Sequence, residues 1–306
     1  MPPESILIAG IGALACYFAA RQAPYAEVTL LGTWPQGLAA LQENGVQLTA
    51  ADGETRSFKV RATNDPADCE GHRSALVLVK SWQTGRAAEQ LAACLDEDGV
   101  ALTLQNGLGN FEILQRVLGE PRAAQGVTTT GATLLGPGRV REGGEGVVLI
   151  AEHPRSAPLV ELLETADFEV EIAADMESVL WGKMVVNAAI NPLTAILGVP
   201  NGDLLEQPHA RRLMQAAAAE VACVAHACGV TLPYSDPAEE VERVARQTAQ
   251  NRSSMLQDVT RGAPTEIDAI NGAVVEAAEE IGLKVPVTET LWHLVHALVS
   301  VSRRDA

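Results

Sequence analysis

Residues 5–15 read Ser-Ile-Leu-Ile-Ala-Gly-Ile-Gly-Ala-Leu-Ala, and this stretch decides the fold of the N-terminal half. The apolar run up to Ala9 predicts a buried strand, and the next six residues match G-x-G-x-x-G/A, in which a strand turns into a helix. In this pattern Gly10 makes the tight turn, and Gly12 lets a pyrophosphate approach the backbone at the helix N-terminus. The alternative is a glycine-rich turn without a ligand. We predict dinucleotide binding by Gly10, Ile11, Gly12, Ala13, Leu14 and Ala15.

Short apolar segments alternate with helical patterns up to about residue 175. Strands are expected at residues 5–9, 27–31, 75–80, 100–104, 127–135, 140–141, 147–151 and 168–172. Helices are expected at residues 13–21, 36–44, 85–95, 107–118 and 158–165. Strands that alternate with helices in this way predict a parallel sheet covered on both faces.

From residue 176 the pattern changes to long helical periods with few strand signals. The clearest expected helices are residues 211–228, 237–251, 265–281 and 287–303. We therefore predict an α/β fold with two domains. Residues 1–175 would form a doubly wound, Rossmann-type dinucleotide-binding domain, and residues 176–306 a mainly α-helical substrate-binding domain.

The net charge of −17 over 306 residues argues against nucleic acid as a partner. A polyanion would be repelled, and no basic run is present to neutralise phosphates. The apolar run at residues 6–20 lacks the positive charge that precedes a secretory signal, and it is too short to span a bilayer as a helix. We expect a cytoplasmic protein without a membrane partner. The sequence leaves the oligomeric state open, with a homodimer as one option.

The five cysteines are odd in number and show no CxxC spacing, so we expect free thiols in a reducing compartment. Cys223, His226 and Cys228 are close in sequence, which raises the question of a metal. They lie in an alanine-rich helical run with no fourth ligand nearby. This context favours buried packing residues, and no metal site is expected.

A stripe of three polar side chains marks the helix expected around residues 181–192. Lys183, Asn187 and Asn191 recur every four residues, with mainly apolar residues between them. Positions four apart advance by only about 40° around a helix, so one amine and two amides form a narrow line. A solvated face would be wider and more heavily charged. We predict that the stripe binds a small polar ligand, against the alternative that it faces water or a neighbouring helix.

The ends of the later strands supply further candidates. Leu31-Gly-Thr-Trp34 holds neither the acid typical of an NAD site nor an arginine for a 2′-phosphate. Thr33 could donate a hydroxyl there. Lys80 is the nearest cation, although it could equally cap a strand end in solvent. Asn106, in Gln105-Asn-Gly-Leu-Gly109, would reach a ligand cleft with its amide or would simply form a turn.

Together these motifs resemble those of ketopantoate reductase (2-dehydropantoate 2-reductase). The family reduces ketopantoate to D-pantoate with NADPH, on the pathway to pantothenate and coenzyme A. The matching runs follow the family's order over nearly the whole chain: Gly10 to Ala15, Lys80-Ser-Trp-Gln83, Gln105 to Gly109, Thr128-Thr-Thr130, Asn191-Pro-Leu-Thr-Ala-Ile196, Pro200-Asn-Gly202 and Ser253 to Asp268.

The resemblance implies a role for individual residues. Lys183 resembles the proton donor to the substrate C2 oxygen, and Glu266 resembles the carboxylate beside the substrate and the nicotinamide ribose. Substrate contacts are implied for Asn106, Lys183, Asn187, Asn191, Asn201 and Ser254. NADP contacts are implied for residues 10–15, Thr33, Lys80, Gln83, Asn106 and Glu266.

Two positions depart from the family's pattern. Thr33-Trp34 stands where the family usually has an arginine for the 2′-phosphate, which predicts a weaker preference for NADP. Gly131 stands where a histidine often follows the threonine triplet, and this change is expected to affect a loop.

The chemistry agrees with the roles implied for Lys183 and Glu266. Hydride addition to a ketone leaves an alkoxide, which needs a proton and a nearby positive charge. Apolar surroundings lower the pKa of a lysine, and a nearby carboxylate opposes that shift. Taken alone, Glu266 could instead be a first-turn acid that complements a helix dipole. The alternatives to this enzyme are a paralogue that reduces another branched 2-keto acid and a nucleotide-sensing regulator that kept the fold.

Overall fold

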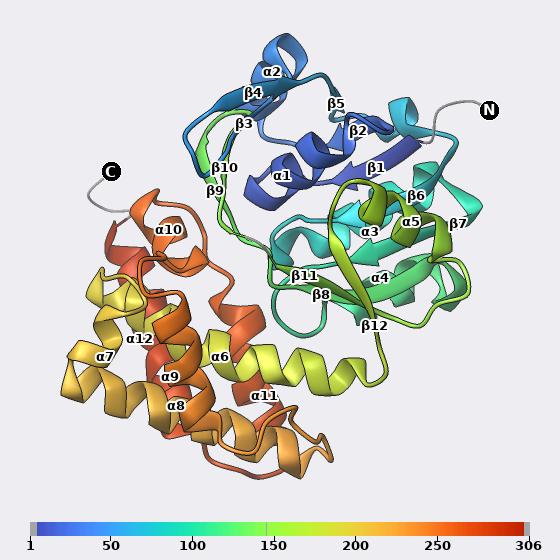
Figure 1. The fold of residues 1–306 in the computed structure, drawn as a ribbon. Helices are drawn as coiled ribbons and strands as arrows, with labels where there is room; N and C mark the ends of the chain where they lie inside the picture. Colours follow the sequence, from blue (N-terminus) through green and yellow to red (C-terminus); the bar gives the residue numbers. More distant parts are fainter. Residues whose placement is uncertain (1–4, 145, 303–306) are drawn as a thin grey trace. The chain divides into compact units, whose positions relative to one another are not determined.

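The computed structural model of the protein describes residues 5–144 and 146–302 (Figure 1). The chain divides into two compact units. The first comprises Met1–Gln105 and Gly109–Met176, and the second comprises Glu177–Ala306 together with Asn106–Leu108. The short segment Asn106–Leu108 therefore belongs to the helical unit, although the strand before it and the helix after it belong to the first unit.

The first unit is built on an eight-stranded sheet with the order β12-β11-β8-β7-β6-β1-β2-β5. Every neighbouring pair is parallel except β8 and β11, so the sheet has the doubly wound, Rossmann-type character that the sequence predicts. Its strands are β1 (Ser5–Ala9), β2 (Glu27–Leu31), β5 (Arg61–Thr63), β6 (His72–Val77), β7 (Leu95–Thr103), β8 (Ala123–Thr128), β11 (Val147–Ala151) and β12 (Glu169–Ala173).

Helices cover both faces of this sheet, and β1 shows why. Ile6 and Ile8 pack into the core that contains residues of α1 and α5, whereas Leu7 and Ala9 pack into the core that contains residues of α3 and α4. A strand buried on both faces reads as a continuous apolar run, as β1 does. The helices of this unit are α1 (Ala13–Gln22), α2 (Pro35–Asn44), α3 (Thr84–Cys94), α4 (Asn110–Leu118) and α5 (Ala157–Thr165), with 3₁₀ turns η1 (Pro66–Cys69), η2 (Ser81–Gln83) and η3 (Glu120–Arg122).

A second, four-stranded sheet with the order β4-β3-β10-β9 was not predicted. It consists of β3 (Val46–Thr49), β4 (Thr55–Phe58), β9 (Ala132–Gly136) and β10 (Arg139–Glu142). The strand expected at residues 127–135 is in fact two strands, β8 and β9, which belong to different sheets. Gly131 lies between them, where an added Cβ would come within 3.3 Å of the Gly143 carbonyl oxygen.

The helical unit is arranged around one long buried helix, α6 (Met176–Leu197), in a core shared with α8, α11 and α12 (Figure 1). α6 is long and apolar enough to cross a membrane by length and composition alone, but 67% of its most apolar window is buried inside the protein. It is therefore built as a core helix. The other helices are α7 (Asp203–Glu206), α8 (Pro208–Ala227), α9 (Pro237–Gln247), α10 (Ser254–Thr260), α11 (Ala273–Glu280) and α12 (Pro286–Ser302), with one π-helical turn, η4 (Asp268–Gly272).

Three further expectations were wrong about where an element begins or ends, or about its regularity. The helix expected at residues 265–281 begins with the π turn η4 and continues as α11. The helix expected at residues 107–118 begins only at Asn110, because Gly107 and Gly109 adopt positive φ angles of 89° and 84°. The strand expected to end at Lys80 ends at Val77, and Lys80 precedes the turn η2.

The cysteines are free, but two of them do not pack as expected. Cys223 and Cys228 are exposed, whereas we expected both to be buried. Cys223 lies outside the buried stripe of α8, and Cys228 follows the end of that helix. Among residues 5–144 and 146–302, no group of three or more His, Cys, Asp or Glu side chains is arranged to hold a metal ion.

Candidate active site

The glycine turn after β1 leaves room for a ligand at the start of α1. Gly10 has a φ of 132°, and a Cβ there would lie 2.9 Å from the backbone of Leu78 on the neighbouring chain segment. A Cβ on Gly12 would meet nothing within 4 Å. Gly12 is also the N-cap of α1, with no side chain to cap it and no acid in the first turn. The first amides of α1 can therefore donate to an anion that approaches over Gly12.

Ile11 turns inward and fixes the segment after β2. It is 6% exposed, and a Cβ on Gly32 would lie 2.7 Å from its side chain. A Cβ on Gly37 would lie 2.5 Å from the Trp34 ring, which therefore packs against the first turns of α2. Thr33 is left exposed at the end of β2. This segment thus presents a hydroxyl, but no charge, at the strand next to β1.

Lys80 and Gln83 lie on the other side of β1, after β6. Gln105 ties the two strand ends together, because its Nε2 donates to the Val79 carbonyl (2.9 Å) and to Thr84 Oγ1 (2.8 Å). Gln105 and Thr84 are both buried, so this network holds the turn that carries Lys80 and Gln83 in place. Lys80 and Gln83 are themselves half-buried.

In the helical unit, α6 carries Lys183, Asn187 and Asn191 as predicted, on one line of the helix. Lys183 and Asn187 are half-buried, and Asn191 is buried. Burial lowers the pKa of the Lys183 ammonium from 10.5 to about 8, and the charge of Glu266 opposes this shift. Glu266 itself is only 6% exposed. A largely desolvated amine with a carboxylate near enough to influence its pKa can donate a proton near neutral pH.

Pro192 interrupts the hydrogen bonding of α6, and a side chain from η4 compensates. Proline has no N–H, so the carbonyl of Ala188 loses its partner within the helix. Asn271, which is fully buried, donates its Nδ2 to that carbonyl at 3.1 Å. Asn271 was not among the residues predicted from the sequence.

Ser254 begins α10, and its neighbour Ser253 attaches that helix to α6. Ser253 Oγ accepts from the Leu256 amide at 3.0 Å and lies 2.7 Å from Thr194 Oγ1. Thr194 donates its own hydroxyl proton to the Asn191 carbonyl (2.9 Å), so the Ser253 hydroxyl donates to Thr194. The half-buried Ser254 is thereby held beside the part of α6 that carries Asn191.

Asn201 offers a buried hydrogen-bond acceptor. Its Nδ2 donates to Thr248 Oγ1 at 2.9 Å, and Thr248 in turn donates to the Val244 carbonyl at 2.7 Å. Because the Thr248 proton is used in this way, Thr248 can only accept from Asn201, which fixes the orientation of the amide. The Oδ1 of Asn201 is buried and makes no hydrogen bond among the described residues. It can accept a hydrogen bond from a ligand hydroxyl or a water.

The loop with Asn106 is held by η4. The Leu108 amide donates to the Ala269 carbonyl at 3.0 Å, and a Cβ on Gly107 would lie only 2.4 Å from the same oxygen. Of the predicted site residues, the first unit contains residues 10–15, Thr33, Lys80 and Gln83, and the helical unit contains Asn106, Lys183, Asn187, Asn191, Asn201, Ser254 and Glu266.

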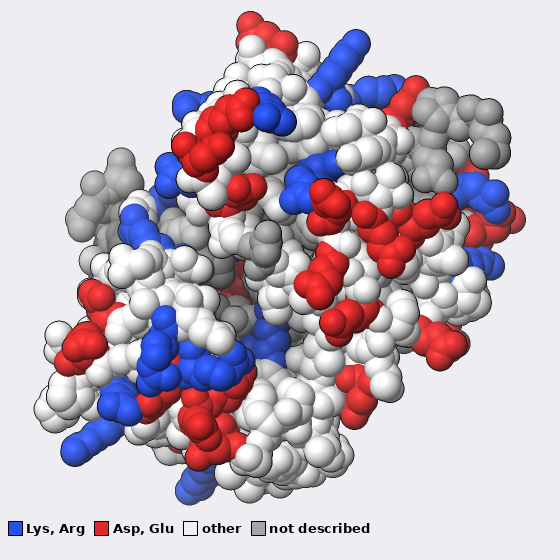
Figure 2. Space-filling view, viewed as in Figure 1, with Lys and Arg blue, Asp and Glu red and all other residues white. Residues whose placement is uncertain are grey.

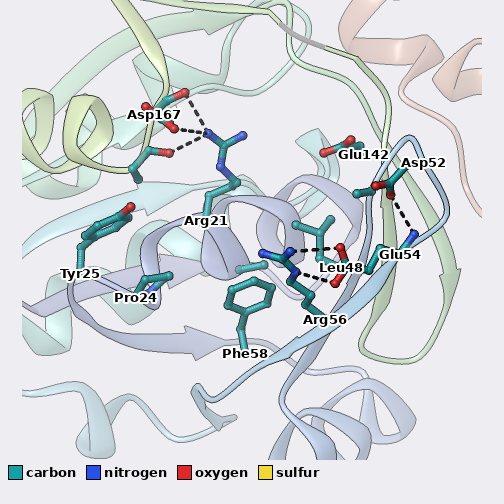
Figure 3. Close-up of a pocket in the computed structure, with 13 residues that line it drawn as sticks. Arg21, Pro24, Tyr25, Leu48, Asp52, Glu54, Arg56, Phe58, Glu142 and Asp167 are labelled. Carbon is teal, nitrogen blue, oxygen red and sulfur yellow. Dashed lines mark hydrogen bonds and ion pairs between the residues drawn. The ribbon is translucent and has the colours of Figure 1, made fainter.

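One cavity of about 380 Å³ lies in the first unit, at the C-terminal end of α1 (Figure 3). Arg21 borders it, but this guanidinium already donates to the Tyr17 hydroxyl and to the carbonyls of Ala166 and Asp167. Arg56 also borders it and is paired with Glu54. The cavity lies at the opposite end of α1 from Gly12, and none of the predicted site residues lines it.

The surface charge agrees with the composition. On the face shown in Figure 2, acidic side chains are spread widely, and basic side chains lie among them singly or in small groups. That face offers no extended basic surface for a polyanion such as nucleic acid.

Comparison with known proteins identifies relatives along nearly the whole chain. Residues 6–155 match the family model described as "Ketopantoate reductase PanE/ApbA", and residues 175–299 match "Ketopantoate reductase PanE/ApbA C terminal". The 2-dehydropantoate 2-reductase of Archaeoglobus fulgidus is 40% identical, with 79% of this chain and 81% of that protein covered. The 2-dehydropantoate 2-reductase of Halobacterium salinarum is 37% identical, with 88% and 89% covered.

Two solved structures have the same fold as this chain. A PanE/ApbA family ketopantoate reductase from Ralstonia eutropha superposes with a TM-score of 0.90 at 32% identity, and the match covers 98% of this chain and 99% of that one. D-mandelate dehydrogenase, solved with NADH and anilino(oxo)acetate, superposes with a TM-score of 0.92 at 24% identity, with 98% and 99% covered. The second likeness concerns the fold alone.

Proposed function

Because this chain belongs to the ketopantoate reductase family, we propose that it reduces 2-dehydropantoate to D-pantoate with NADPH, in the biosynthesis of pantothenate and coenzyme A. The observation that carries the proposal is the half-buried amine of Lys183 on the polar stripe of α6, whose pKa is lowered by burial to about 8 although the charge of Glu266 opposes the shift. Reduction of a 2-keto acid needs one hydride at C2 and one proton at the C2 oxygen. A lysine of this acidity can supply the proton at neutral pH.

In this proposal the Lys183 ammonium donates to the C2 oxygen as negative charge develops on it. Before the transfer, its positive charge stabilises the growing alkoxide. Glu266 keeps the amine protonated over a wider pH range than burial alone would allow, and it orients the amine. The two asparagines of the same stripe, Asn187 and Asn191, hold the substrate in line with Lys183.

Ser254 and Asn201 match the two other polar groups of the substrate, its carboxylate and its C4 hydroxyl. Ser254 offers a hydroxyl to the substrate carboxylate. Asn201 offers its unpartnered Oδ1 to a donor, and 2-dehydropantoate carries a hydroxyl at C4 that can donate. A buried acceptor of this kind disfavours an analogue that lacks the hydroxyl, because the acceptor would then stay unpaired.

The first unit fits a nicotinamide dinucleotide, which supplies the hydride when bound. The open space over Gly12 and the uncapped amides of α1 suit a pyrophosphate. We propose NADP as the preferred form, because no acid follows β2 to repel a 2′-phosphate and Lys80 can attract one. Thr33, Gln83, Asn106 and Glu266 would contact the remainder of the cofactor. Without an arginine at Thr33, the preference for NADPH over NADH is modest.

The test is NADPH oxidation by the purified protein with 2-dehydropantoate and with a panel of other 2-keto acids. The panel includes 3-methyl-2-oxobutanoate, which has the same branched skeleton without the hydroxymethyl group. We expect kcat/KM to be highest for 2-dehydropantoate, and Asn201→Ala to narrow its advantage over 3-methyl-2-oxobutanoate. Faster reduction of an unhydroxylated acid would assign the chain to a different 2-keto acid, and no oxidation with any acid would refute the proposed activity.

We also propose that the protein works in the cytoplasm. Among the described residues, the one helix that is both long and apolar enough to cross a membrane, α6, is built into the core of the helical unit and carries the polar stripe. Neither a regulator without turnover nor a reductase of another keto acid is favoured by the relatives named above.

A further inference from the structure

The π turn η4 contacts three segments of the helical unit: the loop that carries Asn106, helix α6 and helix α12. None of its own residues belongs to the proposed substrate or cofactor site. It starts two residues after Glu266, and the Ala273 amide donates to the Asp268 carbonyl in the wider π pattern. Widened turns of this kind direct carbonyls and side chains away from the regular helical ladder, and they occur frequently at functional sites.

Two groups of η4 reach the proposed catalytic segments directly. The Ala269 carbonyl accepts from the Leu108 amide at 3.0 Å, which fixes the loop that carries Asn106. Asn271 Nδ2 donates to the Ala188 carbonyl on α6, between the positions of Lys183 and Asn191. The turn therefore links the Asn106 loop and Glu266 to the helix that carries Lys183.

On its outer side η4 is attached to α12 by Asp268. Asp268 Oδ1 accepts from Trp292 Nε1 at 2.8 Å and lies 2.7 Å from His296 Nε2. Gly272 allows this approach, since a Cβ there would lie 3.2 Å from Trp292 Nε1. Asp268 is exposed and points to α12, so it acts through the turn and not on the substrate.

We propose that η4 is a positioning element of the reductase: it sets Asn106 and Glu266 in register with Lys183, and Asp268 is the positioning residue that fixes it to α12. The kinetic part of this inference rests on the proposed function. Displacement of reacting groups by about 1 Å is enough to reduce turnover on the order of a hundredfold. Loosening η4 should thus lower kcat for the keto acid more than it changes either Michaelis constant.

The first test compares Asp268→Ala with Asp268→Asn, which keeps an oxygen acceptor for Trp292. Glu289→Ala is the control, because Glu289 pairs with His293 on the same helix and is not a partner of Asp268. We expect Asp268→Ala to lower kcat about tenfold or more, with both Michaelis constants within about threefold of wild type. Asp268→Asn should recover most of the loss, and Glu289→Ala should behave as wild type.

Amide hydrogen exchange at Leu108 gives a readout that requires no substrate. We expect faster exchange in Asp268→Ala than in wild type, Asp268→Asn or Glu289→Ala. Unchanged exchange in Asp268→Ala would overturn the proposal, and so would faster exchange with an unchanged kcat. A wild type that reduces no keto acid would refute the proposed function. The exchange measurement would still decide whether Asp268 holds the loop.

A second pair of variants tests the contact itself. Gly107→Ala and Gly109→Ala impose similar backbone strain, because both glycines have φ near +85°, but only the first brings a Cβ against the Ala269 carbonyl. We expect Gly107→Ala to lower kcat and Leu108 protection more than Gly109→Ala does. Equal losses in the two variants would mean that strain in the loop, and not its contact with η4, matters.

Discussion

The lowered pKa of Lys183 predicts how keto acid reduction depends on pH. Only the ammonium form can donate a proton, so kcat/KM should be level below about pH 7 and fall as the pH rises through about 8. Each pH unit above the pKa removes about nine-tenths of the remaining ammonium, so kcat/KM at pH 9 should be about tenfold below its value at pH 7. A lysine that kept a pKa of 10.5 would show the same fall about two and a half units later.

Glu266→Gln perturbs this profile in a defined direction. Burial lowers the pKa of Lys183 and the Glu266 carboxylate raises it, so removing the carboxylate charge leaves burial unopposed. The fall in kcat/KM should therefore move to lower pH, and the ratio of variant to wild-type kcat/KM should decrease as the pH rises, with its lowest values above about pH 8. Lys183→Ala should lose the fall altogether, with turnover lower by about a hundredfold or more while NADPH still binds.

The assay is the initial rate of NADPH oxidation across pH 6 to 10, at saturating NADPH and low keto acid. Because Glu266 is also proposed to contact the cofactor, saturation is checked for each variant. A primary isotope effect with deuterated NADPH establishes that hydride transfer limits the rate. The reasoning is refuted if wild-type activity is level to pH 10, if the fall persists in Lys183→Ala, or if Glu266→Gln moves it upward.

The remaining predictions concern single contacts. Asn187→Ala and Ser254→Ala should each raise the Michaelis constant for the keto acid roughly tenfold to a hundredfold, because each variant loses one hydrogen bond to a charged group. Unchanged Michaelis constants in steady-state kinetics would mean that the substrate binds elsewhere. Thr33→Arg should widen the ratio of kcat/KM for NADPH over NADH, and a narrower ratio, or a wild type that prefers NADH, would contradict the cofactor proposal. Gly12→Ala should weaken NADPH binding with little change in melting temperature, because the added Cβ points into open space. Gly10→Ala should lower the melting temperature, because its Cβ meets the backbone of Leu78. Similar melting temperatures for the two variants would contradict these roles of the two glycines.

The large sheet was predictable because its signals are local. β1 is a continuous apolar run directly before the glycine pattern, and both features can be read within eleven residues. The second sheet could not be predicted in the same way. β3 has only four residues, and β4 reads Thr-Arg-Ser-Phe with three exposed residues. These strands form because β3 pairs with β4 and also with β10, which lies about ninety residues further along the chain.

The candidate site was predictable to the extent that residue type reveals chemistry. Lys183, Asn187 and Asn191 share a helix face that can be inferred from spacing alone. The unpaired acceptor Oδ1 of Asn201 cannot be inferred from the sequence. It depends on the Thr248 hydroxyl, which donates to the Val244 carbonyl and therefore accepts from the Asn201 amide nitrogen. Glu266 and Lys183 are more than eighty residues apart, and their electrostatic coupling arises only from the packing of the helical unit.

The π turn was hidden because the apolar period across it is that of an ordinary helix. Ile267, Ile270, Val274 and Ala278 are all buried at helical spacing, which is why residues 265–281 read as one helix. The departure from this pattern is a polar residue, Asn271, on the buried stripe. A buried amide needs a partner, and Pro192 in α6 leaves a carbonyl that needs a donor. In the structure, Asn271 Nδ2 donates to this carbonyl. A helical proline, which leaves a carbonyl unpaired, and an amide on an otherwise apolar helix stripe should therefore be considered together when a sequence is read. The two features together predict a contact that neither of them predicts alone.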